Sequence, residues 1–334
     1  MSAGLNTNFD IPFRCVPAVQ NTIDRIDRTE DVCFSPDGTL LAIASYYINK
    51  IFIFKLELQQ DHGKLQILLT DYLEINSSNF DHPHGIGWFD NQTIIVANRK
   101  ANPAVIPLPT IWPNDRVCNL RPIQTLKFGK LAVPDVQKVG ANSNLCVSKL
   151  DQNLFAVYVC SNNGNVVTHH ILNANNNFQV ENSKILLKKD LKVPDGVRVS
   201  DNGNWIAVSN HLCDCVHVYS TQSDLTVESA ALALLKGTLF PHGLGFYDDD
   251  RIIVVSDSGA PFVHFYYSPT GDWNGEFLPV YTMQVISNED FTELHVKKSD
   301  GGPKGISIFS NILAVTSQKI ILKFVDLDKI CENL

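Results

Sequence analysis

A short pattern of polar and apolar positions recurs along almost the whole chain. In its clearest form it is a proline, a variable residue and a glycine, followed by an alternating apolar run. A polar turn comes next, and then a second apolar run that ends in a small polar residue. The six copies begin near residues 29, 83, 142, 194, 241 and 303. Self-similarity at a spacing of roughly 50 residues indicates a repeat architecture.

Each copy predicts β-strands. Apolar residues recur with period two, for example at Ile252 and Val254 in the fifth copy. Asp-Gly and Asn-Gly pairs separate such runs, which is the pattern of β-hairpins. A third apolar run follows in most copies, as at residues 215–220. No long stretch has the 3.6-residue period of a helix, so the chain is predicted to be all-β.

The number of copies decides the predicted arrangement. Six unevenly spaced units in 334 residues favour a six-bladed β-propeller with four-stranded blades over a solenoid of identical coils. Rings of this size commonly form one domain, here residues 1–334. After the strands of the last copy only residues 328–334 remain, too few for an outer strand. We therefore expect an N-terminal strand at about 13–20 to pair with the last blade and close the ring.

Composition limits the partners and the location. The formal net charge is −8, and no stripe of basic residues with interleaved aromatic residues is present. This disfavours binding to nucleic acid, whose phosphates attract basic surfaces. The sequence has no apolar run of roughly 18 residues and no standard signal peptide, which predicts no membrane span and a cytoplasmic location. Export is expected only if a signal has been removed.

Polar residues mark the strand ends that are expected to face the axis. The first strand of each blade lines the channel and the second returns antiparallel to it, so the start of one and the end of the other share a mouth. With six blades, His84 faces His242 and Glu30 faces Asp195. The inner ring contains Glu30, Asp31, His84, Ser143, Asn144, Asp195, His242 and Lys304. The outer ring contains Ser45, Asn98, Ser161, Asn210, Asp257 and Ser317, with Arg99 and His211 just beyond.

Two interpretations of this mouth remain open. Converging carboxylates and imidazoles are ligands for a divalent cation or components of a general base. Alternatively, residues that precede a strand at a water-filled channel are polar only because they cap turns. A second metal candidate, the alternating His211, Cys213, Cys215 and His217, is disfavoured because side chains in line along one strand cannot form a tetrahedron.

The motifs resemble a known family along nearly the whole chain. They are TEDV at 29–32, HPHGI at 82–86, the Asn-rich entry at 142–145, PDGV at 194–197 and a Cys-Glu pair near the end. Together they are similar to the six-bladed, calcium-dependent propellers of the paraoxonase and gluconolactonase superfamily, which includes the senescence-marker-like proteins. The resemblance implies a metal at the mouth and hydrolysis of esters or lactones there.

The resemblance also implies roles for single residues. Glu30 would bind the catalytic calcium from the first blade, and Asp31 would serve a second, structural calcium. His84 matches the histidine that the family places in its second blade. Ser143 or Asn144 would supply the ligand from the third blade.

Two positions depart from the family's pattern. Asp195 stands where the family usually has Asn, and His242 stands where Asp or Asn is usual. Because calcium prefers oxygen ligands, a set with two histidines suits a transition metal better. The expected cofactor is therefore a divalent metal, calcium or a transition metal, held by Glu30, Asn144, Asp195 and His242.

The expected function is metal-dependent hydrolysis of a lactone or ester at the central mouth. His84, or else His242, would activate water as general base. Lys304 would neutralise an anionic substrate group or pair with Glu30. Substrate contacts are expected from Lys304, Asn98, Asn210 and Asp257. The alternative is a non-catalytic propeller that binds a small molecule in its channel, a carbohydrate or a protein partner.

Two of the eight cysteines lie near the ends that are expected to meet. Laying the N-terminal strand beside the last blade would bring Cys15 towards Cys331. The family that the chain resembles closes its ring with a disulfide in this way. We expect the two residues to be neighbours, bonded only if the protein is exported, since disulfides are rare in the reducing cytosol.

Overall fold

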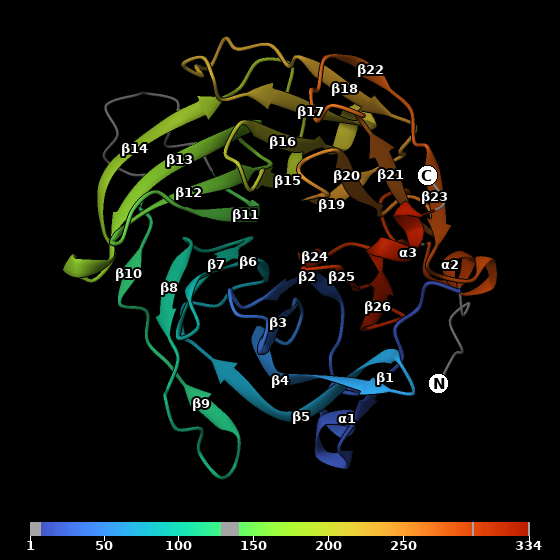
Figure 1. The fold of residues 1–334 in the computed structure, drawn as a ribbon. Coiled ribbons are helices and arrows are strands. Elements are labelled where there is room, and N and C mark those ends of the chain that lie inside the picture. Colours follow the sequence, from blue (N-terminus) through green and yellow to red (C-terminus); the bar gives the residue numbers. More distant parts are fainter. Residues whose placement is uncertain (1–7, 128–139, 296, 333–334) are drawn as a thin grey trace.

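The fold is a ring of β-sheets around a central axis, as Figure 1 shows. The computed structural model describes residues 8–127, 140–295 and 297–332. Its strands form six sheets, each with an inner strand beside the axis and later strands towards the outside. The predicted all-β, six-bladed propeller is confirmed.

The sheets follow one another in sequence order, and neighbouring strands within each blade run antiparallel. Blade one contains β2 (Thr29–Phe34), β3 (Leu40–Ser45), β4 (Lys50–Asp61) and β5 (Lys64–Asn76). Blade two contains β6 (Pro83–Asp90), β7 (Thr93–Asn98), β8 (Ala104–Pro107) and β10 (Gln124–Thr125). Blade three contains β11 (Asn142–Lys149), β12 (Leu154–Ser161), β13 (Val166–Asn173) and β14 (Gln179–Leu187).

The second half repeats this plan. Blade four contains β15 (Pro194–Val199), β16 (Trp205–Asn210), β17 (Cys215–Ser220) and β18 (Ala233–Lys236). Blade five contains β19 (Pro241–Tyr247), β20 (Ile252–Asp257), β21 (Phe262–Tyr267) and β23 (Tyr281–Gln284). Blade six contains β24 (Ile306–Phe309), β25 (Ile312–Val315) and β26 (Lys323–Asp326). Parallel additions are β9 (Val117–Asn119) on β5 and β22 (Gly275–Phe277) on β18. The α-helices are α1 (Pro17–Ile23), α2 (Asn288–Leu294) and α3 (Leu327–Cys331).

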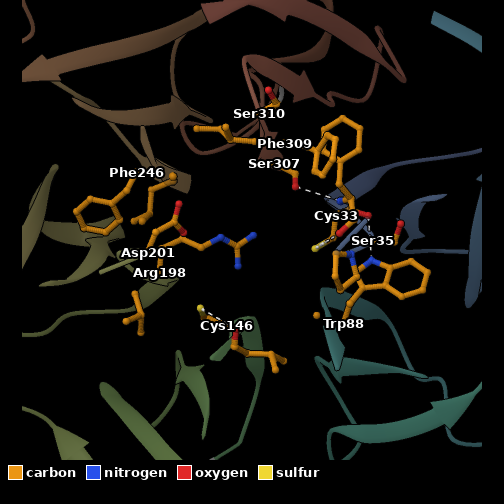
Figure 2. A pocket seen from close by; sticks show the side chains of 18 residues that line it. Cys33, Ser35, Trp88, Cys146, Arg198, Asp201, Phe246, Ser307, Phe309 and Ser310 are labelled. Carbon is orange, nitrogen blue, oxygen red and sulfur yellow. Dashed lines mark hydrogen bonds between the residues drawn. The ribbon is translucent and has the colours of Figure 1, made fainter. Parts of the chain in front are cut away.

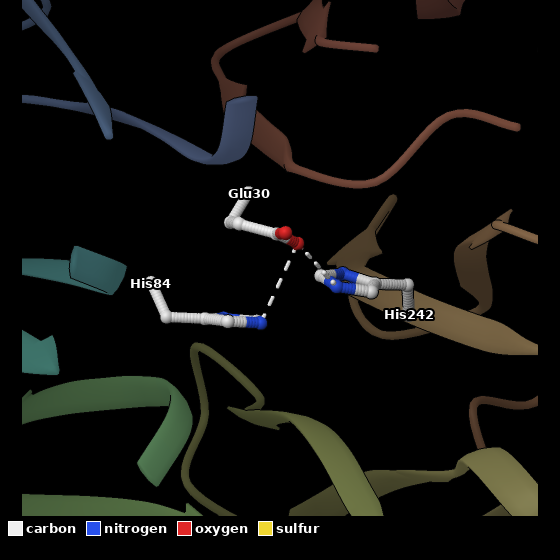
Figure 3. A group of neighbouring side chains, drawn as sticks. All are labelled: Glu30, His84 and His242. Carbon is white, nitrogen blue, oxygen red and sulfur yellow. Dashed lines mark ion pairs between the residues drawn. The ribbon is translucent and has the colours of Figure 1, made fainter. Parts of the chain in front are cut away.

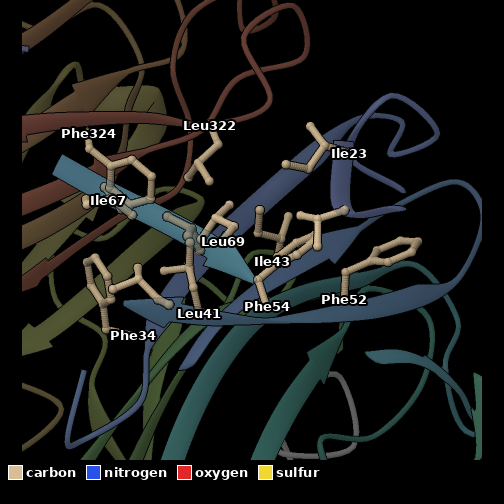
Figure 4. Close-up of a cluster of buried hydrophobic side chains, with 14 of the residues drawn as sticks. Ile23, Phe34, Leu41, Ile43, Phe52, Phe54, Ile67, Leu69, Leu322 and Phe324 are labelled. Carbon is tan, nitrogen blue, oxygen red and sulfur yellow. The ribbon is translucent and has the colours of Figure 1, made fainter. Parts of the chain in front are cut away.

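The hydrophobic core lies between consecutive blades. Figure 4 shows one such layer, in which Phe34, Leu41 and Phe54 of blade one pack with Phe324 of blade six. Leu41, Phe54 and Phe324 are essentially buried from solvent. The apolar residues of the alternating strands therefore hold the blades together, and the first blade packs against the last.

The glycine of the recurring motif has a packing role at the axis. A Cβ atom on Gly85 would lie 2.6 Å from Cα of Asn144 in the next blade, and one on Gly305 would lie 2.5 Å from Cα of Asp31 in blade one. Only a residue without a side chain permits this approach of backbone to backbone. The motif therefore recurs because inner strands of neighbouring blades touch there.

The N-terminal segment closes the ring at residues other than those predicted. Asp10 bridges to Val325 of β26, and the N–H of Ile11 donates to the carbonyl of Phe324 at 3.0 Å. Of the predicted segment 13–20, β1 (Phe13–Cys15) instead runs parallel to β5 in blade one. Pro17 then begins helix α1, since its fixed φ and missing N–H suit a first helical turn. The prediction of a strand across 13–20 on the last blade is wrong.

This shift also changes the environment of the two terminal cysteines. Both are free thiols. Cys15 packs with the core between blades six and one, whereas Cys331, in α3, packs with the core around blades five and six. The structure therefore places them in different hydrophobic clusters, because Phe9–Ile11, and not β1, lies along the last blade. The described residues contain no helix that is long and apolar enough to span a membrane.

Candidate functional site

The recurring motif forms a bulge at the start of five inner strands. In β15 the pairing with β16 shifts between Pro194 and Val197, and β6 and β19 have the same irregularity after their first proline. A bulge interrupts the regular pairing and changes the direction of the side chains that it contains. Here it contains the variable residue of the motif, which is His84, Asp195 or His242. The repeat therefore places chemically active side chains at one mouth of the channel.

The side chains of Glu30, His84 and His242 meet on the axis. Oε2 of Glu30 lies 3.5 Å from Nε2 of His84 and 3.4 Å from Nε2 of His242. The two imidazole rings are nearly parallel, with centroids 5.3 Å apart and planes 14° apart. Figure 3 shows both rings directed towards the carboxylate. Their ligand atoms all lie within 4.8 Å of one another, so the cluster could hold a metal ion.

Asp195 adds a second carboxylate to the cluster. Its Oδ2 lies 3.4 Å from Nε2 of His242 and 3.7 Å from Nδ1 of His211, and its Oδ1 lies 3.8 Å from Nε2 of His84. Burial acts to raise the pKa of Asp195, but the neighbouring imidazoles of His242 and His84 hold it well below its usual range. Asp195 is therefore ionised, and it connects His84 and His242 to a third histidine.

Basic side chains balance the charge of Glu30. Nζ of Lys304 lies 3.0 Å from Oε2, and the guanidinium of Arg28 pairs with Oε1. Arg28 also lies 3.3 Å from Asp300. Glu30 is fully buried, which acts to raise its pKa, but Lys304 and Arg28 hold the pKa well below the usual value. Glu30 is therefore an anion in the interior, and the predicted pairing with Lys304 is present.

Arg99 contributes to the protonation state of His84. Its Nη2 lies 3.0 Å from Nε2 of His84. Burial and, secondly, the positive charge of Arg99 hold the pKa of His84 well below its usual value. The imidazole is therefore neutral, and Nε2 is the nitrogen that accepts from Arg99. His84 is for this reason a poor acceptor for a further proton at that atom.

The predicted outer ring has another role in the structure. Asn98 accepts from the N–H of Asp81 at 3.1 Å, and Asn210 accepts from the N–H of Lys192 at 2.6 Å. Asp257 accepts backbone N–H groups from the 239–240 and 259 positions. All three are buried. They hold the loops that enter the inner strands, and substrate contact by Asn98, Asn210 and Asp257 stays a prediction.

Three members of the inner ring also lie outside the cluster. The amide oxygen of Asn144 accepts the N–H of Leu145 at 2.6 Å, and Ser143 donates to the carbonyl of Pro194 at 3.1 Å. Asp31 accepts the N–H of Ile86 at 2.9 Å, and burial raises its pKa to about 6. These groups serve the backbone, and the role of Asn144 as a metal ligand stays a prediction.

Sequence reasoning missed Arg28 and Asp300 and gave Arg99 and His211 only a position beyond the ring. Arg28 directly precedes the first inner strand, and Asp300 lies in the turn before the sixth copy. Their long or loop-borne side chains reach the axis from positions that the strand pattern does not mark. The sequence marked these four residues only by their position, since each lies within a few residues of a predicted member of the inner or outer ring.

The donor set decides which metal fits. Calcium takes about six to eight oxygen ligands, whereas the cluster offers only the carboxylates of Glu30 and Asp195. Carboxylate and imidazole together suit zinc, manganese or iron. Buried Nδ1 of His84, Nδ1 of His242 and Oδ1 of Asp195 have no hydrogen-bond partner. Buried polar atoms normally have one, so the vicinity of these atoms fits a transition-metal ion or ordered water.

Comparison with known proteins identifies the fold. No protein-family description and no curated protein matches the chain. Among solved structures, a luciferin-regenerating enzyme is similar with a TM-score of 0.55 and 10% identity, over 90% of each chain. A nidogen/laminin complex gives 0.54 and 11% identity, over 78% of this chain and 83% of that one. A functionally unknown protein from Desulfotomaculum acetoxidans DSM 771 gives 0.51 and 11% identity, over 88% and 84%. At such low identity these similarities show a shared propeller-type fold.

Proposed function

We propose that this chain is a metal-dependent hydrolase of esters or lactones that acts at the central mouth of the propeller. The observation that carries the proposal is the convergence of Glu30, His84 and His242, whose ligand atoms lie within 4.8 Å of one another. The similarity to the luciferin-regenerating enzyme, an enzyme on a propeller-type fold, is compatible with this proposal. The residues that would hold the ion are these three, with Asp195 beside both imidazoles.

The surrounding residues prepare those groups. Lys304 and Arg28 keep Glu30 ionised although it is buried. Burial and Arg99 keep His84 neutral, and a neutral imidazole is the form that binds metals. A bound divalent ion would polarise the carbonyl of the substrate and lower the pKa of water. To bind there, it would have to displace Lys304 and Arg99 from the atoms that they now contact.

The structure favours His211 over His84 as proton acceptor. Nε2 of His84 already accepts from Arg99. Nδ1 of His211 lies 3.3 Å from the carbonyl of Pro241 and 3.7 Å from Oδ2 of Asp195, which orients the ring and leaves Nε2 to receive a proton. A carboxylate behind an imidazole is the usual support of a general base. His211 is 9% exposed, against 0% for His84 and 1% for His242, so it is the least buried of the three histidines.

One observation favours the alternative, a non-catalytic propeller. Both oxygens of Glu30 already have a basic partner, so the cluster is balanced without an ion. Glu30, His84 and His242 are also no more than 1% exposed. Under this alternative the cluster is a polar plug on the axis, and a protein partner binds elsewhere on the ring. The nidogen/laminin complex shows a similar fold in a protein complex.

Metal analysis of the purified chain separates the two functions. After exposure to Zn²⁺, Mn²⁺ or Ca²⁺ and dialysis, we expect one equivalent of a transition metal by elemental analysis and hydrolysis of an aryl acetate or a simple δ-lactone that chelation abolishes. Glu30→Gln keeps the shape of the side chain but removes its charge. Because loss of groups that merely support metal ligands costs about 10–100-fold in affinity, we expect at least that loss here.

Glu74→Gln is the matched control. Glu74 is likewise buried, pairs with Lys50 and lies 3.5 Å from Arg25, but it belongs to the outer strand β5. The control should keep the metal and the activity. A wild-type chain that binds no metal, or a Glu30→Gln variant with unchanged metal content, would reject the hydrolase and leave the polar plug.

A further inference from the structure

The opposite mouth of the channel contains a separate cavity. It has a volume of about 460 Å³ and lies where the inner strands end. All six blades contribute to its wall, and its main lining side chains are Phe34, Trp88, Arg198, Phe246, Ser307 and Phe309. Phe34 follows Glu30 by four residues along β2, so the cavity lies about 13 Å from the cluster of Glu30, His84 and His242. Figure 2 shows the Arg198 side chain extending from its strand into the middle of this space.

Arg198 forms no ion pair within 4 Å of a carboxylate in the described part of the chain. Its Nη1 donates to the carbonyl of Leu145 at 2.9 Å. Its side chain also hydrogen-bonds to Cys146, and Asp31 attracts it without forming an ion pair among the described residues. A guanidinium always carries its charge and has five N–H donors. Most of these donors are therefore available to a ligand in the cavity.

The buried carboxylate of Asp31 offsets the charge of Arg198 in part, from beyond ion-pair distance. Burial raises the pKa of Cys33 to about 12, so this thiol is neutral at physiological pH. Cys146, on the other side, is buried among apolar groups. Asp201 lines the cavity and is exposed. The cavity floor therefore has one guanidinium, which forms no ion pair within 4 Å and whose charge Asp31 offsets only in part.

The wall is mostly polar at its accessible surface, but four aromatic rings in it offer an apolar contact. Phe34 and Trp88 are almost fully buried, and Phe246 and Phe309 are partly exposed at the cavity. The indole N–H of Trp88 is already donated to the carbonyl of Cys33 at 3.1 Å, so the ring offers an apolar surface. Ligand cavities of about 300–1,000 Å³ typically combine such walls with a few polar groups that fix the orientation.

We propose that this mouth binds a small, apolar monocarboxylic acid, with its carboxylate on Arg198 and its hydrocarbon or aromatic part against Phe246 and Phe309. The planar guanidinium matches a carboxylate with two parallel hydrogen bonds. One charge is favoured over two, because a single cation is present and Asp201 lies in the same wall. The site is independent of the proposed hydrolase, whose residues lie at the other mouth.

Calorimetry with 2-naphthoate tests this assignment. The uncharged amide of 2-naphthoate tests the need for a charge, and inorganic phosphate tests the need for an apolar part. We expect the wild-type chain to bind 2-naphthoate, and to bind the amide and phosphate at least about tenfold more weakly, since one charge-assisted hydrogen-bond pair corresponds to a factor of roughly 10–100. Arg198→Gln should lose that factor for 2-naphthoate. Arg198→Lys keeps the charge but not the planar fork, so its affinity for 2-naphthoate should lie between those of the wild type and Arg198→Gln.

Arg116→Gln is the control, because Arg116 pairs with Asp71 at the edge of blade one. It should leave binding unchanged, as should Glu30→Gln at the other mouth. Saturating 2-naphthoate should also protect Arg198 from phenylglyoxal, as read by peptide mass spectrometry, which tests the site even if Arg198→Gln does not fold. Equal binding of the amide, tighter binding of phosphate, or modification of Arg198 at an unchanged rate would overturn the proposal.

Discussion

Gly305→Ala is expected to destabilise the folded chain by about 3 kcal/mol, and to leave part of it insoluble. The added Cβ would lie 2.5 Å from Cα of Asp31, 2.6 Å from N of Val32 and 2.7 Å from the carbonyl carbon of Asp31. All three atoms belong to the backbone of blade one and cannot rotate away. The contact joins the last blade to the first, so relief would require the ring to open. Urea unfolding followed by tryptophan fluorescence measures the loss.

Gly140→Ala is the matched control for this prediction. No atom lies within 4 Å of a Cβ built on Gly140, and its φ is not in the left-handed region. The free energy of unfolding should therefore change by no more than about 0.5 kcal/mol. A Gly305→Ala variant as stable as Gly140→Ala would show that the blades separate easily and that the motif's glycine has no packing role.

The repeat pattern was sufficient to predict the ring because its requirements are local. Alternating apolar residues bury one sheet against the next, and the glycine after each variable residue permits the close contact of inner strands. The N-terminal closure failed because a helix competes there. Pro17 begins α1, and Val19, Thr22 and Ile23 are buried at helical spacing. This 3.6-residue pattern was present in the sequence, but the expected pairing of the chain ends obscured it.

The site was predictable only as far as ring symmetry determines it. Equivalent bulges bring His84, Asp195 and His242 together with Glu30, and that convergence follows from the motif alone. The hydrogen-bond and ion-pair partners of these side chains do not follow from the motif. Asn98 occupies a ring position yet bonds to the backbone, and Arg28 occupies none yet pairs with Glu30. A strand pattern gives the position of a residue along the axis, but hydrogen-bonding loops decide which way its polar group points.

The axis therefore contains two different polar environments at its two ends. At one mouth, the carboxylates of Glu30 and Asp195 lie beside the imidazoles of His84 and His242, a donor set that suits a cation. At the other, Arg198 donates to the carbonyl of Leu145 and forms no ion pair within 4 Å, although Asp31 attracts it from farther away. A cation is accordingly proposed for the first mouth and an anion for the second. Variants at one end should leave ligand binding at the other unchanged.

Lys304→Met is expected to cost about 3–5 kcal/mol of stability at pH 7 in metal-free protein, the loss typical of a broken buried ion pair. Lys304 is 5% exposed, Glu30 is 0% exposed, and Nζ lies 3.0 Å from Oε2. Methionine keeps the apolar stem but leaves a buried carboxylate with only one ion pair to a Lys or Arg side chain among the described residues, that with Arg28. Lys236→Met, which breaks an exposed pair with Glu276 at 2.6 Å, should cost less than about 1 kcal/mol.

The pH dependence of this loss identifies Glu30 as its origin. The pKa of Glu30 is lowered in the folded state, whereas an unfolded Glu titrates near about 4.3. Its stabilising contribution is therefore complete above that value and is lost as pH falls towards the folded-state pKa. Because Lys304→Met removes part of this contribution, the difference from wild type should be constant near pH 7 and should shrink below about pH 4. Urea unfolding across this range measures it, and a difference that grows on acidification would exclude the Lys304–Glu30 pair as the cause.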